Sequence, residues 1–405
     1  MEPLIRFDDA FTRIRTHMPN WGFETVPAEE AYGRIAASDV EAEMDVPPFS
    51  RSMMDGYAVM AEDLSRGTTL QVISTVAAGQ PAKSTIEKGQ AVRVMTGAPV
   101  PENAAGVVRD EWCQVLDEAR IEVLRTVFVG ESIQSKGDDG KPGQKLVAQG
   151  TRFTELDVAV LKAFGVTQVS VYRMPSAALI ITGTELVEDV TDELQFGQIY
   201  GTNDALLKGA LESDGICVGL VEYVQDDAEK LTNAVKRASD AHDLVIVTGG
   251  VSVGDFDFTP SAIEGAGSTV HIRKVLMRPG SPFVFATAES TALFGLSGNP
   301  GACFAQFSVL VRPAIRLALG LNDAPFPHSG ILSHDISLKP IKHTRVQRAK
   351  VYVESGQLLV DCQLSQSSGV ISSFVSTDAY VRLDDSTLKN GTVVPLRFVR
   401  NLPGC

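Results

Sequence analysis

Residues 176–320 alternate between short apolar segments and longer amphipathic ones, and this alternation limits the possible folds more than any other feature of the chain. The apolar segments have the length of strands, and the amphipathic segments have the spacing of helices. This pattern is typical of a doubly wound α/β domain, in which helices cover both faces of a sheet. In chain order it predicts a strand at 177–181, a helix at 203–213, a strand at 216–224, a helix at 227–239 and strands at 244–247 and 293–296.

The remaining segments predict further domains. Apolar residues at steps of three and four from Leu4 to Met18 predict a first helix, and a second helical pattern occupies 155–164. Short alternating runs between glycine and proline turns predict a β-rich segment at 70–76, 90–95 and 120–129, and a small all-β domain at 348–354, 357–363, 379–383 and 392–399. We therefore predict a split helical domain (1–41 and 138–175), an inserted β-rich domain (42–137), the α/β domain (176–322) and a C-terminal β domain (323–405).

Composition excludes several classes of protein. Fifty acidic against 36 basic side chains give a formal net charge of −14, which disfavours binding to nucleic acid or anionic membranes. Five scattered cysteines without a CxxC pair favour a reduced, cytoplasmic compartment. Charges at Arg6 and Asp8 come too early for a signal peptide. The uncharged segment 290–311 reaches membrane-spanning length, but Pro300 and several glycines interrupt it, so it predicts a strand, a turn and a helix.

Unusual residues follow each predicted strand of the α/β domain. In an open α/β sheet, ligands bind beyond the carboxyl ends of the strands, so these residues should meet at one rim. Glycines at 249, 250 and 254, with Ser252 among them, permit close backbone approach to a phosphate. Asn299 and Pro300 have the pattern of a helix start that points at the same rim. The four strand ends are 182–185, 225–227, 248–254 and 297–300, and together they predict a site for a nucleotide or pyrophosphate.

Carboxylates cluster at the predicted phosphate site and would repel the ligand unless a cation lies between them, which favours Mg²⁺. They are Glu185, Asp226, Asp227, Asp255 and Asp257. A simpler interpretation of Asp227 is that it caps the helix that follows, and a Gly-Gly turn after a strand is often only a tight connection. Lys274 and Arg278 would project from one face of an extended segment and could hold a second anion, or could be ordinary solvated charges.

Two rigid loops of the β-rich segment display polar side chains. Asp55 lies in the prolyl loop 47–59, and Thr96 lies in the loop 95–101. Turn chemistry explains the glycines and prolines of both loops. It does not explain the polar residues, and rigid loops commonly display binding groups.

Five strings of this sequence resemble one known family. PPFSRSMMDGYAV, VRVMTGAPVP, GQIYGTN, TGGVSVGDFDFT and LSGNPGACF occur in the order, and close to the spacing, of molybdopterin molybdenumtransferases of the MoeA and gephyrin E-domain type. The resemblance covers nearly the whole chain. It implies a split helical domain, an inserted β domain, an α/β molybdopterin-binding domain and a C-terminal β barrel, assembled as an elongated homodimer. Molybdopterin adenylyltransferase and recipient molybdoenzymes are implied as possible partners.

The resemblance also implies a reaction, in which adenylylated molybdopterin and molybdate give molybdenum cofactor and AMP in the presence of Mg²⁺. Glu185, Asp226 or Asp227, and Asp257 would bind Mg²⁺ or the ligand, while Lys274, Arg278 and Ser297 would help to hold the ligand or the oxyanion. Asp55 and Thr96 match positions that reach the α/β site of the other subunit. The implied ligand-binding residues are Thr182, Gly183, Asn203, Gly249, Gly250, Ser252, Gly254, Ser297, Gly298 and Asn299.

Several positions depart from the family pattern, mainly around the predicted oxyanion site. Thr184 and Gly201 stand where many members have Asp, and Ser281 and Arg278 stand where Lys is common. Gly106 also replaces a common Asp, and 368–370 replace a segment with a Ser-His pair. Two alternatives to the insertase stay open: a molybdopterin adenylyltransferase, because the α/β domain resembles that enzyme as well, and a non-catalytic molybdopterin-binding scaffold, which only the departures support. The sequence does not distinguish molybdate from tungstate.

Overall fold

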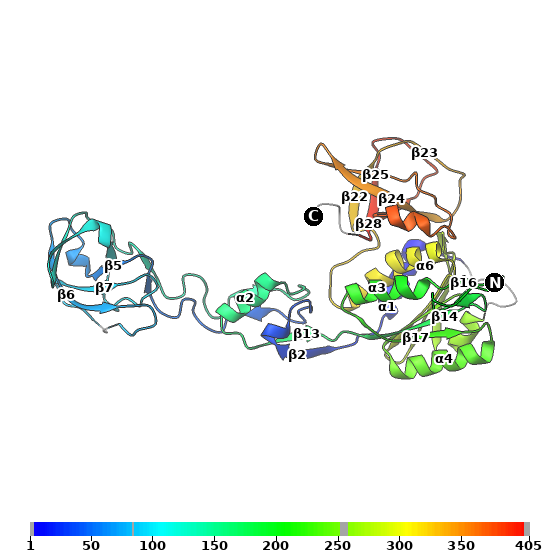
Figure 1. Cartoon of the computed structure of the whole chain (residues 1–405), viewed down its shortest axis with the longest axis horizontal. Helices are drawn as coiled ribbons and strands as arrows, with labels where there is room; N and C mark the ends of the chain where they lie inside the picture. Colours follow the sequence, from blue (N-terminus) through cyan, green and yellow to red (C-terminus); the bar gives the residue numbers. More distant parts are fainter. Residues whose placement is uncertain (1–3, 83–84, 252–257, 401–405) are drawn as a thin grey trace.

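The computed structural model describes residues 4–82, 85–251 and 258–400, and it is strongly elongated (Figure 1). The α/β domain lies at one end of the molecule with the C-terminal β domain against it. A small middle domain separates these two from the inserted β-rich domain at the far end. None of the helices among the described residues is long and apolar enough to cross a membrane.

The α/β domain has the doubly wound architecture that the alternating pattern predicts. Its strand order is β17-β14-β18-β21-β20-β19, in which the first four strands are parallel and β20 is antiparallel to both its neighbours. One core cluster contains α4 and α5 residues, and another, on the opposite face, contains residues of α3 and the helices after β21. The elements are β14 (Ser176–Thr182), α3 (Asn203–Ser213), β17 (Cys217–Val224), α4 (Ala228–Ala241), β18 (Leu244–Thr248), α5 (Thr259–Gly265), β19 (Thr269–Arg278), β20 (Pro282–Ala288), β21 (Thr291–Leu296), α6 (Pro300–Gln306), a π-helical turn (Phe307–Val311) and α7 (Arg312–Ala318).

The first helix, α1 (Phe7–His17), packs on the α/β domain, although the sequence groups it with the split domain. Phe7, Ala10 and Ile14 are buried in the α/β core, where α1 contacts α7 and β19. The preceding β1 (Ile5–Arg6) pairs with β19, which guides the helix onto this face. The predicted helix is confirmed, but its partner is the α/β domain, because β1 docks there before the chain reaches the middle domain.

The middle domain is built from two distant segments that pair through strands. Strand β2 (Phe23–Pro27) pairs with β13 (Gln168–Tyr172), and β3 (Val40–Glu41) pairs with β12 (Lys145–Val147). Helix α2 (Glu155–Ala163) starts at a capping box between Thr154 and Asp157. Their buried side chains form a separate core cluster.

The inserted domain is a six-stranded sheet of order β8-β5-β7-β6-β10-β9, with a smaller pairing of β11 and β4. The run predicted at 120–129 ends as a strand at Val123, because the chain then leaves the ladder and exposes Phe128 and Val129. The strands are β4 (Arg51–Ser52), β5 (Gly56–Val59), β6 (Thr69–Val76), β7 (Gln90–Val94), β8 (Gly106–Arg109), β9 (Cys113–Asp117), β10 (Arg120–Val123) and β11 (Ile133–Gln134).

The C-terminal domain is a closed five-stranded barrel, because β24 pairs with both β25 and β26. The barrel joins the α/β sheet where β24 pairs with the end of β19. A buried ion network also links them, since Asp323 contacts both Arg316 of α7 and Arg397 of the barrel. These contacts fix the barrel over one edge of the α/β domain. Its strands are β22 (His328–Leu332), β24 (Thr344–Glu354), β25 (Gln357–Asp361), β26 (Ala379–Leu383) and β28 (Val393–Phe398).

Candidate functional site

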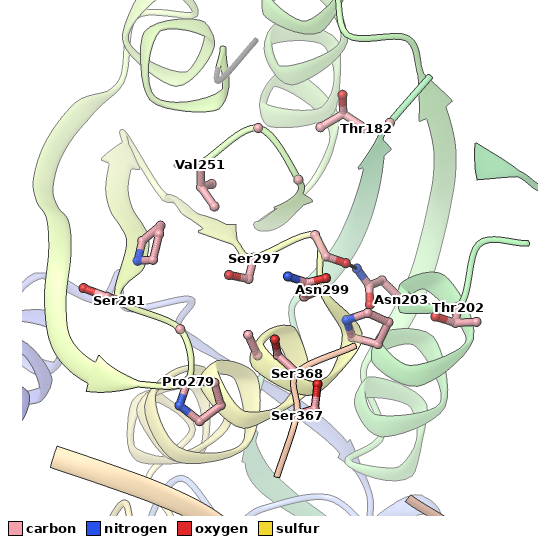
Figure 2. Close-up of a pocket in the computed structure, with 18 of the residues that line it drawn as sticks. Thr182, Thr202, Asn203, Val251, Pro279, Ser281, Ser297, Asn299, Ser367 and Ser368 are labelled. Atoms are coloured by element: carbon pink, nitrogen blue, oxygen red, sulfur yellow. Dashed lines mark hydrogen bonds between the residues drawn. The ribbon is translucent and has the colours of Figure 1, made fainter. Parts of the chain in front are cut away.

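A cavity of about 970 Å³ lies where the carboxyl ends of the α/β strands face the barrel (Figure 2). The α/β domain supplies most of its walls, and barrel residues 343–347 and 366–368 supply the remainder. The cavity brings together eleven of the residues that the sequence selected. They are Thr182, Gly183, Glu185, Asn203, Asp226, Gly249, Gly250, Arg278, Ser297, Gly298 and Asn299.

Gly249 and Gly250 form a tight turn directly after β18. Both have positive φ, +99° and +57°, a conformation that favours glycine. A Cβ on Gly249 would lie 2.4 Å from the carbonyl oxygen of Thr182, so the backbones of two neighbouring strand ends meet here. Thr259 holds the turn by donating its hydroxyl to Gly249 O at 2.7 Å and its N–H to Gly250 O at 2.9 Å. The predicted site residues Ser252, Gly254 and Asp257, and also Asp255, lie outside the described residues.

Gly249→Ala is expected to lower the free energy of unfolding by about 3 kcal/mol, because the added methyl group meets both an unfavourable φ and the Thr182 carbonyl. Urea unfolding of both proteins measures the change. Gly209→Ala in α3 is the matched control, since nothing lies within 4 Å of the added Cβ and its φ is not positive. Equal stabilities of the Gly249→Ala and wild-type proteins would contradict the close approach of the two strands.

Asn203 is a buried amide with one unused acceptor. Its Nδ2 donates to Gly298 O at 2.8 Å, and this bond ties the start of α3 to the turn before α6. Its Oδ1 is buried without a hydrogen-bond partner among the described residues. Buried polar atoms are nearly always paired, so this oxygen is available to an N–H or O–H donor of a ligand.

Asn299 begins α6, as the sequence predicts, with Pro300 at the first helical position. Its side chain makes no capping hydrogen bond and lies beside Ser297 in the cavity (Figure 2). Ser297 offers only its hydroxyl, because its N–H already donates to Gln306 Oε1 at 2.8 Å.

The carboxylates at the rim have different environments. Asp226 accepts from the Thr182 hydroxyl at 2.6 Å and from the N–H and hydroxyl of Thr184 at 3.0 and 3.2 Å. It therefore holds the loop after β14. Glu185 lines the cavity, and its carboxylate makes no hydrogen bond or ion pair within the described part of the chain. Asp227 lies outside the cavity and accepts from the N–H groups of Glu229 and Lys230, which is the capping role that the sequence left open.

Two arginines and a histidine line one end of the cavity. Arg278 of β19 and Arg345 of β24 are direct neighbours across a parallel pairing, and His343 lies two residues before Arg345. Burial and the positive charge of Arg278 lower the pKa of Arg345. Like charges on neighbouring strands repel each other, and an anion between them would remove the repulsion. Lys274 pairs with Pro282 and does not line the cavity.

The barrel supplies a loop that the sequence singled out only at Ser368, through the departing segment 368–370. Arg348 is 3% exposed and donates from Nη2 to Ser365 O and Ser367 O, both at 2.7 Å. Ser368 O in turn accepts the N–H of Gly301 in α6 at 2.9 Å. These bonds hold Ser367 and Ser368 against the cavity (Figure 2). Ser367 and Arg345 have no local sequence signal, because contacts of the barrel alone place them there.

Asp55 and Thr96 do not contribute to the cavity of their own chain. Asp55 Oδ1 accepts from the Thr96 N–H at 2.7 Å and from its hydroxyl at 2.8 Å, and these bonds lower the pKa of Asp55. Both residues lie in the inserted domain, at the opposite end of the elongated molecule (Figure 1). Within one chain, Asp55 and Thr96 are therefore far from the cavity.

The domain order and the cavity define a multidomain protein whose doubly wound α/β domain carries a ligand-sized cavity between the carboxyl ends of its strands and a C-terminal barrel. Residues 5–165 match the family model described as the MoeA N-terminal region (domain I and II). Residues 178–317 match the model described as a probable molybdopterin binding domain.

Similarity to named proteins extends over nearly the whole chain. Molybdopterin molybdenumtransferase of Staphylococcus epidermidis is 37% identical over 90% of this chain and 88% of its own length. The protein of that name from Bacillus subtilis is 36% identical over 99% of this chain and 95% of its own length. The crystal structure of a molybdopterin biosynthesis MoeA protein from Pyrococcus horikoshii matches with a TM-score of 0.86 and 31% identity, over 98% of this chain and all of that one. The chain therefore belongs to the molybdopterin molybdenumtransferase family, which confirms the resemblance of its five sequence strings.

Proposed function

We propose that this protein inserts molybdenum from molybdate into adenylylated molybdopterin and releases AMP. The observation that carries the proposal is a single cavity that joins a glycine turn suited to phosphate with a pair of neighbouring arginines suited to an oxyanion. The two substrates supply these anions, because adenylylated molybdopterin carries the phosphates and molybdate is the oxyanion. The names of the relatives and the family models support the same reaction.

The phosphates of the ligand would lie at the turn after β18. The Gly249 N–H is already bonded to Leu296 O at 3.0 Å, so the N–H groups of Gly250 and Val251, which line the cavity, would be the donors for phosphate. Asn203 Oδ1 would accept from an N–H or O–H group of the pterin or ribose. Ser297 would donate its hydroxyl. These groups act by holding the ligand in one geometry, and the chemistry needs no protein nucleophile.

Mg²⁺ fits the carboxylate rim in the way this ion usually binds nucleotides. The described residues include no group of three His, Cys, Asp or Glu side chains that could hold a metal by themselves. Mg²⁺ commonly uses only one or two carboxylates together with substrate phosphates. Glu185, with its free carboxylate, would supply one ligand, and Asp226 would supply a second or orient the loop that carries Glu185. When bound, the ion would neutralise charge on the phosphoanhydride.

Molybdate would bind between Arg278 and Arg345. A guanidinium is a planar cation that can donate two hydrogen bonds to a tetrahedral oxyanion. Arg278 therefore carries the role that lysine has in many family members, and Arg345 compensates for the missing second lysine at Ser281. We propose no role for Lys274, which lies outside the cavity.

We further propose that the protein acts as a homodimer in which each inserted domain completes the site of the other subunit. Asp55 and Thr96 are exposed, mutually bonded and remote from their own cavity, as residues that serve a second copy would be. An adenylyltransferase would supply the substrate, and apo-molybdoenzymes would receive the product. Cytoplasmic location stays a prediction from the sequence.

The purified protein, incubated with adenylylated molybdopterin, molybdate and Mg²⁺, is expected to release AMP and to activate an added apo-molybdoenzyme. Omission of molybdate or addition of a chelator should abolish both signals. Formation of adenylylated molybdopterin from ATP, without its consumption when molybdate is added, would instead identify an adenylyltransferase. Tight binding of the substrate without AMP release would identify a scaffold.

A further inference from the structure

Gln306 is a fully buried amide, 0% exposed, at the end of α6. The next residue begins the π-helical turn, and π turns inside helices are frequent at functional sites. Burying an amide is costly unless its hydrogen bonds are replaced, and its neighbours Ala305 and Phe307 are apolar core residues. A polar side chain at this depth therefore calls for a specific set of partners.

Its partners are the backbones of the two turns that carry the proposed oxyanion ligands. Oε1 accepts the N–H of Ser297 at 2.8 Å. Nε2 donates to Gly280 O at 2.9 Å and to Pro282 O at 2.6 Å. The amide thus bridges the turn between β19 and β20 and the turn between β21 and α6, and both of its N–H donors are used.

The turn between β19 and β20 packs directly on this side chain. A Cβ added to Gly280 would lie 2.6 Å from Gln306 Cγ and 2.8 Å from Cδ, and the φ of Gly280 is +93°. Neither turn can therefore move far without breaking a hydrogen bond or colliding with the amide. Arg278 is two residues before Gly280, so the hydrogen bonds and packing of Gln306 also limit the position of the Arg278 backbone.

We propose that Gln306 is a positioning residue that sets the separation of Arg278 and Ser297 for a tetrahedral oxyanion. This inference rests on the proposed function, because that function places molybdate against Arg278, and it adds the hydroxyl of Ser297 as a further donor to the oxyanion. Hydrogen bonds weaken steeply with misalignment, so a fixed separation matters more for the oxyanion than for the pterin nucleotide. The amide also occupies the Ser297 N–H, which leaves the serine hydroxyl as the ligand donor of that residue.

Gln306→Met is the first test, because methionine keeps the length of the side chain and removes all three hydrogen bonds. We expect the dissociation constant for molybdate, measured by calorimetry on the AMP-saturated protein, to rise about tenfold. The dissociation constant for AMP should change by less than about threefold. In the AMP-release assay, KM for molybdate should rise while kcat changes little. Ser308→Ala is the matched control, because Ser308 is buried in the adjacent turn and its hydroxyl has no partner within the described residues.

Gln306→Glu is the second test and does not depend on how methionine packs. An ionised carboxylate can accept the Ser297 N–H but meets the carbonyls of Gly280 and Pro282 without a donor, whereas the protonated acid can donate to one of them. The dissociation constant of this variant for molybdate, relative to the wild-type value, should therefore fall as the pH is lowered from about 8 to about 6. A merely structural residue would show no such pH dependence.

The two proposals fail in different ways. No AMP release by the wild-type protein would contradict the proposed function, whereas the calorimetric titration with molybdate needs no turnover. Unchanged molybdate affinity in Gln306→Met, or equal losses of molybdate and AMP affinity in both variants, would overturn the positioning role of Gln306.

Discussion

Arg278→Ala is expected to lower kcat/KM for molybdate about a hundredfold in the AMP-release assay. The physical reason is the loss of charge-assisted hydrogen bonds to a doubly charged oxyanion at a site that the barrel partly shields from water. Arg278 is a direct cross-strand neighbour of Arg345, and both line the cavity. The remaining arginine can still attract molybdate but cannot enclose it. Most of the effect should therefore appear as a higher KM for molybdate.

The control for this variant removes a guanidinium elsewhere on the same domain. Arg237 of α4 forms an exposed ion pair with Glu222 at 2.8 Å, away from the cavity. Arg237→Ala should leave the kinetics unchanged, because exposed ion pairs contribute little. Arg278→Lys should retain part of the activity, since a point charge replaces a two-pronged donor. A wild-type KM for molybdate in the Arg278→Ala protein would show that the oxyanion does not bind beside Arg278.

At molybdate concentrations well below KM, the Asp55→Ala and Arg278→Ala proteins are expected to be nearly inactive alone but to regain about a quarter of wild-type activity when their subunits are co-expressed and purified together. In a mixed dimer with shared sites, one site receives intact Asp55 from one subunit and intact Arg278 from the other, while the second site carries both defects. Random assembly makes half of the dimers mixed, and each mixed dimer has one working site of two. AMP release by the unselected pool of dimers, compared with the same amount of wild-type protein, measures the recovery.

A second pair of variants is the control for sharing of the site between subunits. Asp55→Ala and Thr96→Ala both alter the inserted domain, where the two side chains bond each other. Every site of a mixed dimer then retains one defect, so no activity should return. Recovery in this control, or full activity of Asp55→Ala alone, would show that the inserted domain does not complete a partner's site.

Gly201 differs from the family pattern for a local structural reason. A Cβ at this position would lie 2.2 Å from the Tyr223 hydroxyl, so the tyrosine leaves no room for the aspartate that many members have. Burial and the Asp204 carboxylate raise the pKa of Tyr223, so its hydroxyl stays neutral. A side chain at position 201 would therefore require Tyr223 to move.

Gly106 and Gly369, two further departures, have contrasting surroundings. At Gly106 a Cβ would lie 3.0 Å from Leu64 Cδ2 and 3.2 Å from Phe128 O, so packing in the inserted domain leaves little space for a side chain. At Gly369 nothing lies within 4 Å of an added Cβ. Packing therefore accounts for the glycine at 106, whereas nothing in the structure explains the glycine at 369.

Local sequence patterns were sufficient to predict the elements and part of the site. The helix at 203–213 and the four predicted strands of the α/β domain match the structure closely, because the periods of apolar residues are set by the side chains of each segment alone. The turn at Gly249 and the helix start at Asn299 were predictable for the same reason. Both depend on backbone conformations that only a few residue types favour. Strands β19 and β20 were not predicted.

Contacts between distant segments decided the rest. Pairing of β1 with β19 brought α1 to the α/β domain, and pairing of β24 with β19 brought Arg345 beside Arg278. The proposed positioning role of Gln306 depends on its hydrogen bonds to two turns that are distant in the sequence. Neither the spacing of apolar residues nor a local motif predicts such long-range contacts, because they depend on how complete domains pack. The sequence by itself thus determined the strands, helices and glycine turns, whereas the tertiary structure decided which charges share the cavity.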